Sequence, residues 1–108
     1  MRTRLKTWAG RSEFEYEGDP LISGTSIYYG KNFKYSAKVS ANQYRNLLKY
    51  FAGTSVPAGT SRTNPPANSM GRWLQQNVTK TALASYVGPI LISHGFAEKE
   101  GAEIKFKG

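Results

Sequence analysis

The chain has 108 residues, of which 39% are apolar and 13% aromatic, enough to bury the core of a single domain. It contains no cysteine and one histidine, which excludes disulfides, thiolate nucleophiles and histidine-rich metal sites. No apolar run approaches the roughly 18 residues of a membrane span, and the polar residues 1–6 lack the hydrophobic region of a signal peptide. We therefore expect a cytoplasmic protein with no membrane segment.

The net charge of +8 is concentrated in the middle of the chain. Outside residues 20–97, seven basic residues cancel seven acidic ones. Residues 20–97, called the acid-free segment below, carry the whole surplus, on Lys31, Lys34, Lys38, Arg45, Lys49, Arg62, Arg72 and Lys80. A segment of one sign attracts polyanions, of which nucleic acid is the commonest. The other interpretation is that the charge only keeps the protein soluble.

The first 39 residues predict β-strands. Residues 13–17 and 33–39 each alternate apolar and polar side chains, so each has one apolar face. The polar face of the first segment is acidic and that of the second is rich in lysine. We therefore expect these two strands to be neighbours, with the two rows of charge opposite each other. Two further short strands are predicted at residues 4–8 and 27–29.

Residues 40–53 carry the clearest helix signal. Ser40 and Gln43 match a capping box, in which each side chain bonds to the backbone amide of the other residue. The apolar residues that follow share one helical face: Tyr44, Leu47, Leu48 and Phe51. Gly53 is placed to end the helix. The long Gly/Pro/Ser/Thr connection to residue 68 leaves room for a short strand near residues 55–56.

Two more helices and a hairpin are predicted after this connection. Asn68 or Ser69 caps a helix that ends near Asn77. A helical pattern restarts at Val78 and continues to residue 94. Gly88-Pro89 interrupts it, and because proline lacks the amide hydrogen, the pattern predicts either a kinked helix or two short ones. The terminal hairpin is expected from residues 96–100 and 103–106.

From Ser40 onward, the order is helix, short strand, helix, tight turn, helix and hairpin. This order resembles the winged helix-turn-helix superfamily of DNA-binding domains over residues 40–107. The resemblance rests on Val78-Thr79-Lys80-Thr81-Ala82-Leu83, where a hydrophobic residue and small polar and basic residues open the third helix. It also rests on Ile90-Leu91-Ile92-Ser93-His94-Gly95-Phe96-Ala97, which is similar to the helix end, glycine and first wing strand of that superfamily.

We therefore predict one α+β domain spanning residues 1–108. Antiparallel β-strands form an N-terminal extension over residues 1–39. A winged-helix-like three-helix unit with a C-terminal β-hairpin follows over residues 40–108.

The resemblance implies that the third helix lies in the major groove of double-stranded DNA. Its groove-facing residues would be Thr79, Lys80, Thr81 and Ser85. Arg72 and Gln75 would hold the DNA backbone, and Arg62 in the long loop would add a phosphate contact. The structural alternatives are that Thr79 caps the helix and that Lys80 and Arg72 are merely solvated. The predicted function is that of a small, basic, non-enzymatic DNA-binding protein, for example a homodimeric transcriptional regulator without cofactor or metal.

A second hypothesis is a protein-interaction or structural module of the same fold that does not bind DNA. Its support is the number of tyrosines and the acidic terminal hairpin, since tyrosine is enriched at protein interfaces. Most of the tyrosines occupy positions expected in the core. Tyr28 and Tyr29 are the exception, because consecutive strand residues point to opposite faces. A protein partner would then bind through the N-terminal strands.

A third hypothesis is a magnesium-dependent nuclease. Glu103-Ile104-Lys105 fits the E-x-K half of a restriction-type motif, in which a carboxylate holds the metal and the lysine positions water. The partner acid would be Glu98, Glu100 or Asp19. His94 has no acid or nucleophile at a useful spacing, and it is better explained as a cap at the carboxyl end of a helix.

Overall fold

The computed structural model describes residues 1–108 and contains two antiparallel sheets and three α-helices. The first sheet has the order β1-β2-β3-β4, with β1 (Thr3–Lys6), β2 (Glu13–Glu17), β3 (Thr25–Tyr29) and β4 (Tyr35–Val39). A short 3-10 helix, η1 (Lys31–Phe33), lies between β3 and β4. The helices are α1 (Ala41–Phe51), α2 (Met70–Asn77) and α3 (Ala84–Ser93). The second sheet has the order β5-β7-β6, with β5 (Ser55–Pro57), β6 (Ala97–Glu100) and β7 (Glu103–Phe106).

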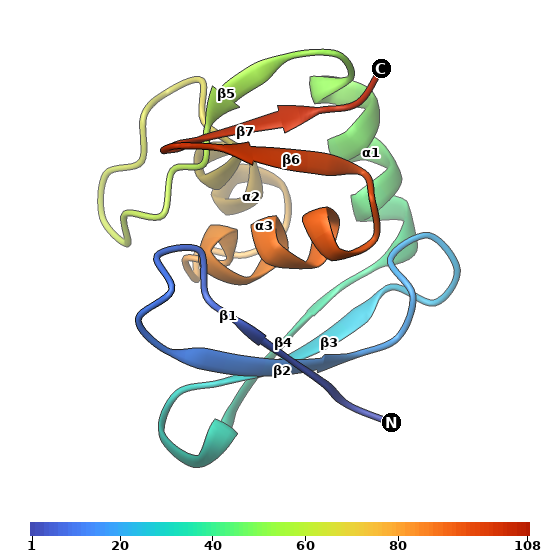
Figure 1. The fold of residues 1–108 in the computed structure, drawn as a ribbon, viewed down its shortest axis with the longest axis vertical. Helices are drawn as coiled ribbons and strands as arrows, with labels where there is room; N and C mark the ends of the chain where they lie inside the picture. Colours follow the sequence, from blue (N-terminus) through green and yellow to red (C-terminus); the bar gives the residue numbers. More distant parts are fainter.

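The helix α3 lies between the two sheets (Figure 1), and this arrangement organises the core. One cluster of 19 buried side chains includes residues of both sheets and all three helices. Val87, Ile90 and Leu91 of α3 are fully buried within it. A helix covered on more than one side is apolar on more than one face, as the sequence of α3 is. The mixed α+β class is thus confirmed, and none of the helices combines the length and apolarity that crossing a membrane requires.

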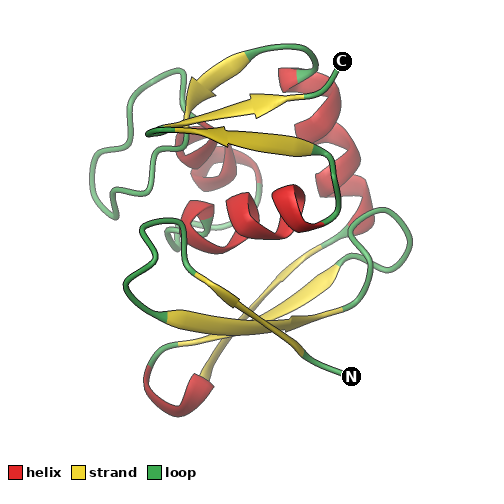
Figure 2. Ribbon diagram, in the orientation of Figure 1, coloured by secondary structure: helices red, strands yellow, loops and turns green.

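The predicted capping signals are confirmed at α1 and α2. The hydroxyl of Ser40 accepts a hydrogen bond from the Gln43 amide at 3.0 Å, and the Gln43 side chain accepts one from the Ser40 amide at 2.9 Å. Ser69 caps α2 by accepting from the Arg72 amide at 3.1 Å. The long connection from β5 to α2 is the green loop on the left of Figure 2.

The predicted start of the third helix at Val78 is wrong, because α3 begins at Ala84. The amides of Val78 and Thr79 both bond to the Leu74 carbonyl, at 2.9 and 3.2 Å, and so complete the end of α2. Residues 79–82 contain no large apolar side chain that packing of a helix would bury. They therefore form the connection between the two helices.

Gly88 and Pro89 lie inside one continuous helix rather than at a break, and they accommodate the turn after β1. Since Pro89 has no amide hydrogen, it leaves the Ser85 carbonyl free, and this carbonyl accepts a hydrogen bond from the Trp8 amide at 2.9 Å. A Cβ on residue 88 would lie 2.6 Å from the Trp8 ring, so only glycine admits this ring. The backbone carbonyl of Trp8 also accepts a hydrogen bond, at 2.6 Å, from the Lys99 ammonium.

The prediction that the acidic strand lies beside the lysine-rich strand is wrong. The strand β2 pairs with β1 and β3, whereas β4 lies at the far edge of the sheet. Short hairpin connections pair consecutive strands, so β3 comes between the two rows of charge. The cations beside Glu15 come from β1 and the residue before it: Arg4 lies 2.9 Å from its carboxylate and Arg2 lies 3.5 Å away.

Candidate nucleic-acid interface

The helix α3, which the resemblance places in a DNA groove, is enclosed by the first sheet and by the β6–β7 hairpin. Phe14 packs edge-on against Tyr86 with 5.2 Å between ring centroids. His94 is the C-cap residue of α3, in agreement with its predicted place at the carboxyl end of a helix. Its side chain shares a hydrogen bond of 2.9 Å with the Tyr16 hydroxyl. Ser93 is the one exposed residue of the helix. The surface available to a ligand is therefore formed mainly by segments around α3, to which the helix adds the partly exposed Tyr86.

Of the predicted contact residues, Arg72 and Gln75 bond through their side chains to other parts of the protein. One Arg72 nitrogen donates to the Pro65 carbonyl at 2.6 Å, and its Nε is buried without a partner. The side-chain amide of Gln75 donates a hydrogen bond to the backbone carbonyl of Arg62 at 3.3 Å. Arg72 and Gln75 thus fasten the long loop to α2, and this loop carries Arg62. Ser85 lies half-buried in the first turn of α3, beneath the turn that carries Trp8, and Thr79 lies half-buried after α2.

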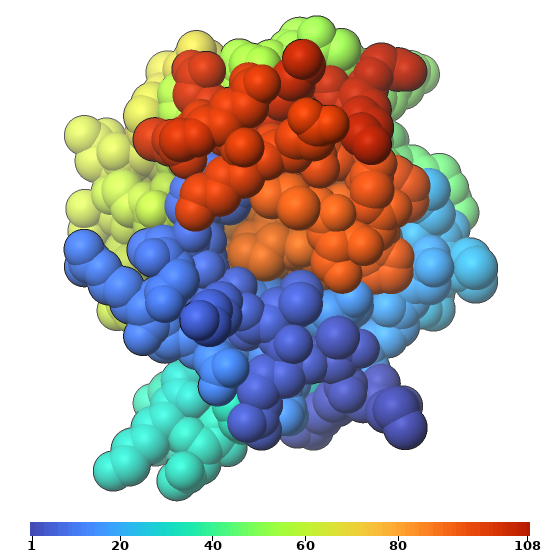
Figure 3. All heavy atoms as spheres, in the orientation of Figure 1, coloured from blue at the N-terminus to red at the C-terminus, as the bar shows by residue number.

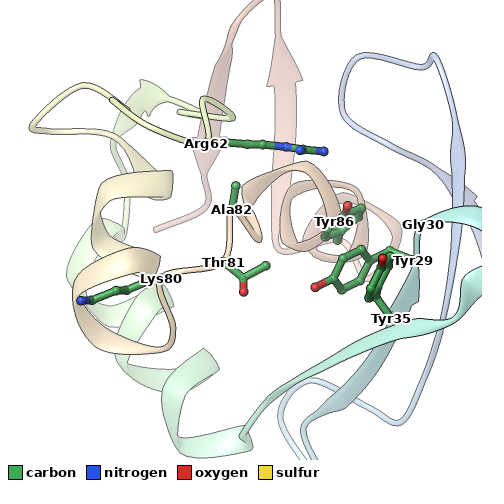
Figure 4. A pocket seen from close by; sticks show the side chains of 8 residues that line it. All are labelled: Tyr29, Gly30, Tyr35, Arg62, Lys80, Thr81, Ala82 and Tyr86. Atoms are coloured by element: carbon green, nitrogen blue, oxygen red, sulfur yellow. The ribbon is translucent and has the colours of Figure 1, made fainter.

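The other three predicted residues, Arg62, Lys80 and Thr81, line one cleft of about 520 Å³ (Figure 4). One wall comes from the β3–β4 hairpin, the other comes from the long loop and the α2–α3 connection, and α3 contributes Tyr86. We call it the tyrosine cleft, and its lining residues are Tyr29, Gly30, Tyr35, Arg62, Lys80, Thr81, Ala82 and Tyr86. All eight belong to the acid-free segment, so no carboxylate lines the cleft.

The three tyrosines form a ladder from the core to the surface. Tyr29 stacks on Tyr86 with centroids 4.9 Å apart and planes inclined by 26°. Tyr35 continues the ladder at 5.8 Å from Tyr29 and is 53% exposed. At the inner end, Tyr86 rests against the buried Phe14. The rings are therefore held by the fold before any ligand arrives.

Gly30 sets the position of the outermost ring. Its φ angle of +82° lies in the left-handed region that favours glycine. A Cβ at this position would lie 2.5 Å from the Tyr35 ring. A glycine here thus allows both the turn and the close approach of the tyrosine to the backbone.

Positive charge surrounds the ladder. The Arg62 side chain extends across the cleft toward the side where Tyr86 lies, whereas the Lys80 ammonium points away from the tyrosines (Figure 4). The Lys34 ammonium lies 5.2 Å from the Tyr35 ring centroid. Burial raises the pKa of the Tyr86 hydroxyl, and the positive charge of Arg62 opposes this shift. The cleft therefore combines exposed aromatic surface with cations that have no internal counter-charge.

The residues of the predicted nuclease motif lie elsewhere. Glu103 and Lys105 occupy the exposed side of β7, where Glu100 and Glu98 are their partners across the hairpin. Asp19 lies in the turn after β2. No three aspartate, glutamate or histidine side chains converge in a way that would hold a metal ion.

Sequence patterns singled out the cations of the cleft but not its tyrosines. The available signal was that Tyr28 and Tyr29, as consecutive strand residues, had to point to opposite faces of the sheet. The contact between them depends on how the sheet packs on α3. Comparisons with protein-family models, curated proteins and solved structures gave no match to this chain.

Proposed function

We propose that this protein binds nucleic acid through the tyrosine cleft, with DNA as the ligand. The observation that carries the proposal is the composition of the cleft. It brings a guanidinium and an exposed tyrosine ring together in a cavity lined by residues of the acid-free segment alone. A nucleic acid offers phosphates and flat bases, which are the groups that cations and aromatic rings bind.

The surface around the cleft supports the same ligand. The tip of the β3–β4 hairpin, in turquoise, projects from the body of the protein (Figure 3). It carries Lys31 and Lys34, which are both exposed, and Arg62 and Lys80 follow on the opposite wall. Cations that line a path without carboxylates displace counterions from a phosphate backbone, and this release drives binding at low salt.

A winged-helix-like arrangement of residues 41–106 remains part of the proposal. The order of elements and the sheet order β5-β7-β6 support it. In this proposal the DNA contacts the connection before α3 and, of the helix itself, the Tyr86 ring that lines the cleft, because the first sheet covers much of the helix. The binding residues are then Arg62, Lys80 and Thr81, joined by the tyrosines.

The test is a titration of fluorescently labelled DNA, followed by anisotropy at low and at physiological salt. The double variant R62A/K80A should bind roughly tenfold or more weakly than the native protein at low salt, with a salt slope reduced by about two. The matched control is K49A/K107A, which removes two exposed lysines outside the cleft. Equal loss in both double variants would show that net charge alone is responsible. Equal binding of polyglutamate would remove nucleic acid as the ligand.

A protein-interaction module is the second candidate, and one observation favours it. Tyr50 is 69% exposed and lies 6.4 Å from the ring centroid of Trp73, beside a cavity of about 300 Å³. Exposed tyrosine next to tryptophan is typical of protein interfaces. Y50A should leave DNA binding unchanged if the cleft alone binds DNA, and a loss of DNA binding in this variant would contradict that assignment.

A further inference from the structure

We infer that the tyrosine cleft takes unpaired nucleotides, so that the ligand class is single-stranded nucleic acid rather than duplex. This assignment rests on the proposed function and specifies its substrate class. A strand of DNA or of RNA offers the same chemistry here, namely a phosphate backbone with bases free to leave their stack.

The surface of the protein offers a hollow, rather than an exposed helix, as the place for a base. A duplex shows only the edges of its bases, and a protein reads them by inserting a helix or ribbon into a groove. The helix α3 is enclosed and offers one exposed residue, Ser93. The tyrosines instead line a hollow of about 520 Å³, a size within the range of small-ligand pockets. A base that has left its stack can enter such a hollow, whereas a base inside a duplex cannot.

The second support is the geometry of the rings. Tyr35 is the outermost ring of the ladder, and with 53% exposure it has surface free for a further stacking partner. Its inner neighbours Tyr29 and Tyr86 are already stacked, and Gly30 fixes the approach of Tyr35. A base that stacks on a tyrosine held in this way loses little binding free energy to side-chain ordering. Stacking of this kind strengthens binding by roughly tenfold per base.

The third support is the placement of charge on both sides of the rings. Lys34 lies against Tyr35 from the hairpin, and Arg62 reaches in from the opposite wall (Figure 4). A base between them would have its flanking phosphates directed toward these two cations. Lys80 points outward and extends the basic path along which the strand would continue.

The second aromatic cavity of the protein shows what the cleft adds. Tyr50, Phe51 and Trp73 line that cavity, but no lysine or arginine does. It offers rings without phosphate-binding groups. Tyr50 is therefore the natural control for Tyr35, because it is exposed and aromatic but lies outside the basic path.

The experiment compares one labelled strand of about twelve thymidines with the same strand annealed to its complement. The native protein should bind the single strand roughly tenfold more tightly than the duplex, as expected from one stacked base. Y35L should lose most of this preference, whereas Y35F, which keeps the ring, should retain it. Y50L should match the native protein. An oligomer of ribothymidine of equal length shows whether the sugar matters, because it keeps the base and changes only the sugar. Tighter binding of either strand than of duplex supports the assignment.

A measurement on the native protein avoids dependence on how the variants fold. Stacking of a base moves the ring-proton resonances of Tyr35 and Tyr29 upfield when the oligonucleotide is added. Equal binding of strand and duplex with no such shift would overturn the assignment to unpaired nucleotides but leave nucleic-acid binding intact. Failure of both ligands to bind better than polyglutamate would overturn the proposed function as well.

Discussion

Tyr28 and Tyr29 are neighbours on β3, yet they face two differently charged surroundings. The Tyr28 ring lies under the guanidinium of Arg2, 3.5 Å from its centroid, and its hydroxyl donates to Glu17 at 2.7 Å. Glu15 on the same face pairs with Arg2 as well. Tyr29 lies in the tyrosine cleft, where no carboxylate lines the wall.

The two faces differ in whether carboxylates lie near the tyrosines and the cations. On the face of Tyr28, the guanidinium groups of Arg2 and Arg4 both pair with the carboxylate of Glu15. In the cleft, Arg62 and Lys80 form no ion pair. The cause lies in the sequence, because the acidic residues flank the acid-free segment and reach β2 but not the cleft. The guanidinium groups beside Tyr28 are therefore paired within the protein, whereas the cations of the cleft are not.

Reversal of one charge on each face should give the largest difference in oligonucleotide affinity between the two faces. R62E should weaken oligonucleotide binding by roughly tenfold or more at low salt, because it places a carboxylate where a phosphate would bind. R2E changes the net charge by the same amount but should weaken binding by about twofold or less, since only the long-range field changes. Anisotropy titrations measure both. Equal losses would mean that the two faces do not differ.

Replacement of glycine should separate the ring geometry from the backbone cost. G30A should destabilise the protein by about 1–3 kcal/mol, because φ of +82° with ψ of −173° is a backbone conformation essentially confined to glycine. It should also weaken single-strand binding severalfold, because the new Cβ displaces the Tyr35 ring. G10A has a similar φ of +75° but open space around it, so it should cost similar stability without loss of affinity. Urea unfolding and anisotropy together decide, and an unchanged affinity in G30A would contradict the role of the ring.

Removal of a hydroxyl should affect the Tyr28 face alone. Y28F loses the 2.7 Å hydrogen bond to Glu17 and should lower the free energy of unfolding by about 0.5–1 kcal/mol. Its affinity for oligonucleotide should stay that of the native protein. Weaker binding in Y28F would show that the outer face takes part.

The smallest effect is expected from the pH dependence of Glu15. Hydrogen bonds from Arg4 hold the pKa of Glu15 below its ordinary value of 4.5, so the folded state binds this proton less readily than the unfolded state. The stabilisation is present above that ordinary value and is lost as pH falls through the folded-state pKa. The Tm difference between the native protein and E15Q should therefore shrink below pH 4.5. A constant difference across this range would exclude the linkage.

Much of the fold was predictable because its signals are local. The capping box at Ser40, the cap at Ser69 and the hairpin after Gly95 depend on neighbouring residues and occur as predicted. The start of α3 was misplaced because Thr79 to Ala82 carry no signal strong enough to distinguish a helix from a connection. The order of the strands was misjudged because complementary charge does not determine which strands pair.

The location of the charge follows from the amino-acid sequence alone, since an interval without acids is a property of the chain in any conformation. Local patterns also indicated most of the segments that form helices and strands, although they misplaced the start of α3. Three sets of contacts depend on the tertiary structure. The Trp8 ring packs against Gly88, and Arg72 donates a hydrogen bond to the long loop. The rings of Tyr29, Tyr35 and Tyr86 pack on one another. These contacts join residues far apart in the chain. They depend on how the first sheet packs against α3, which no local pattern specifies.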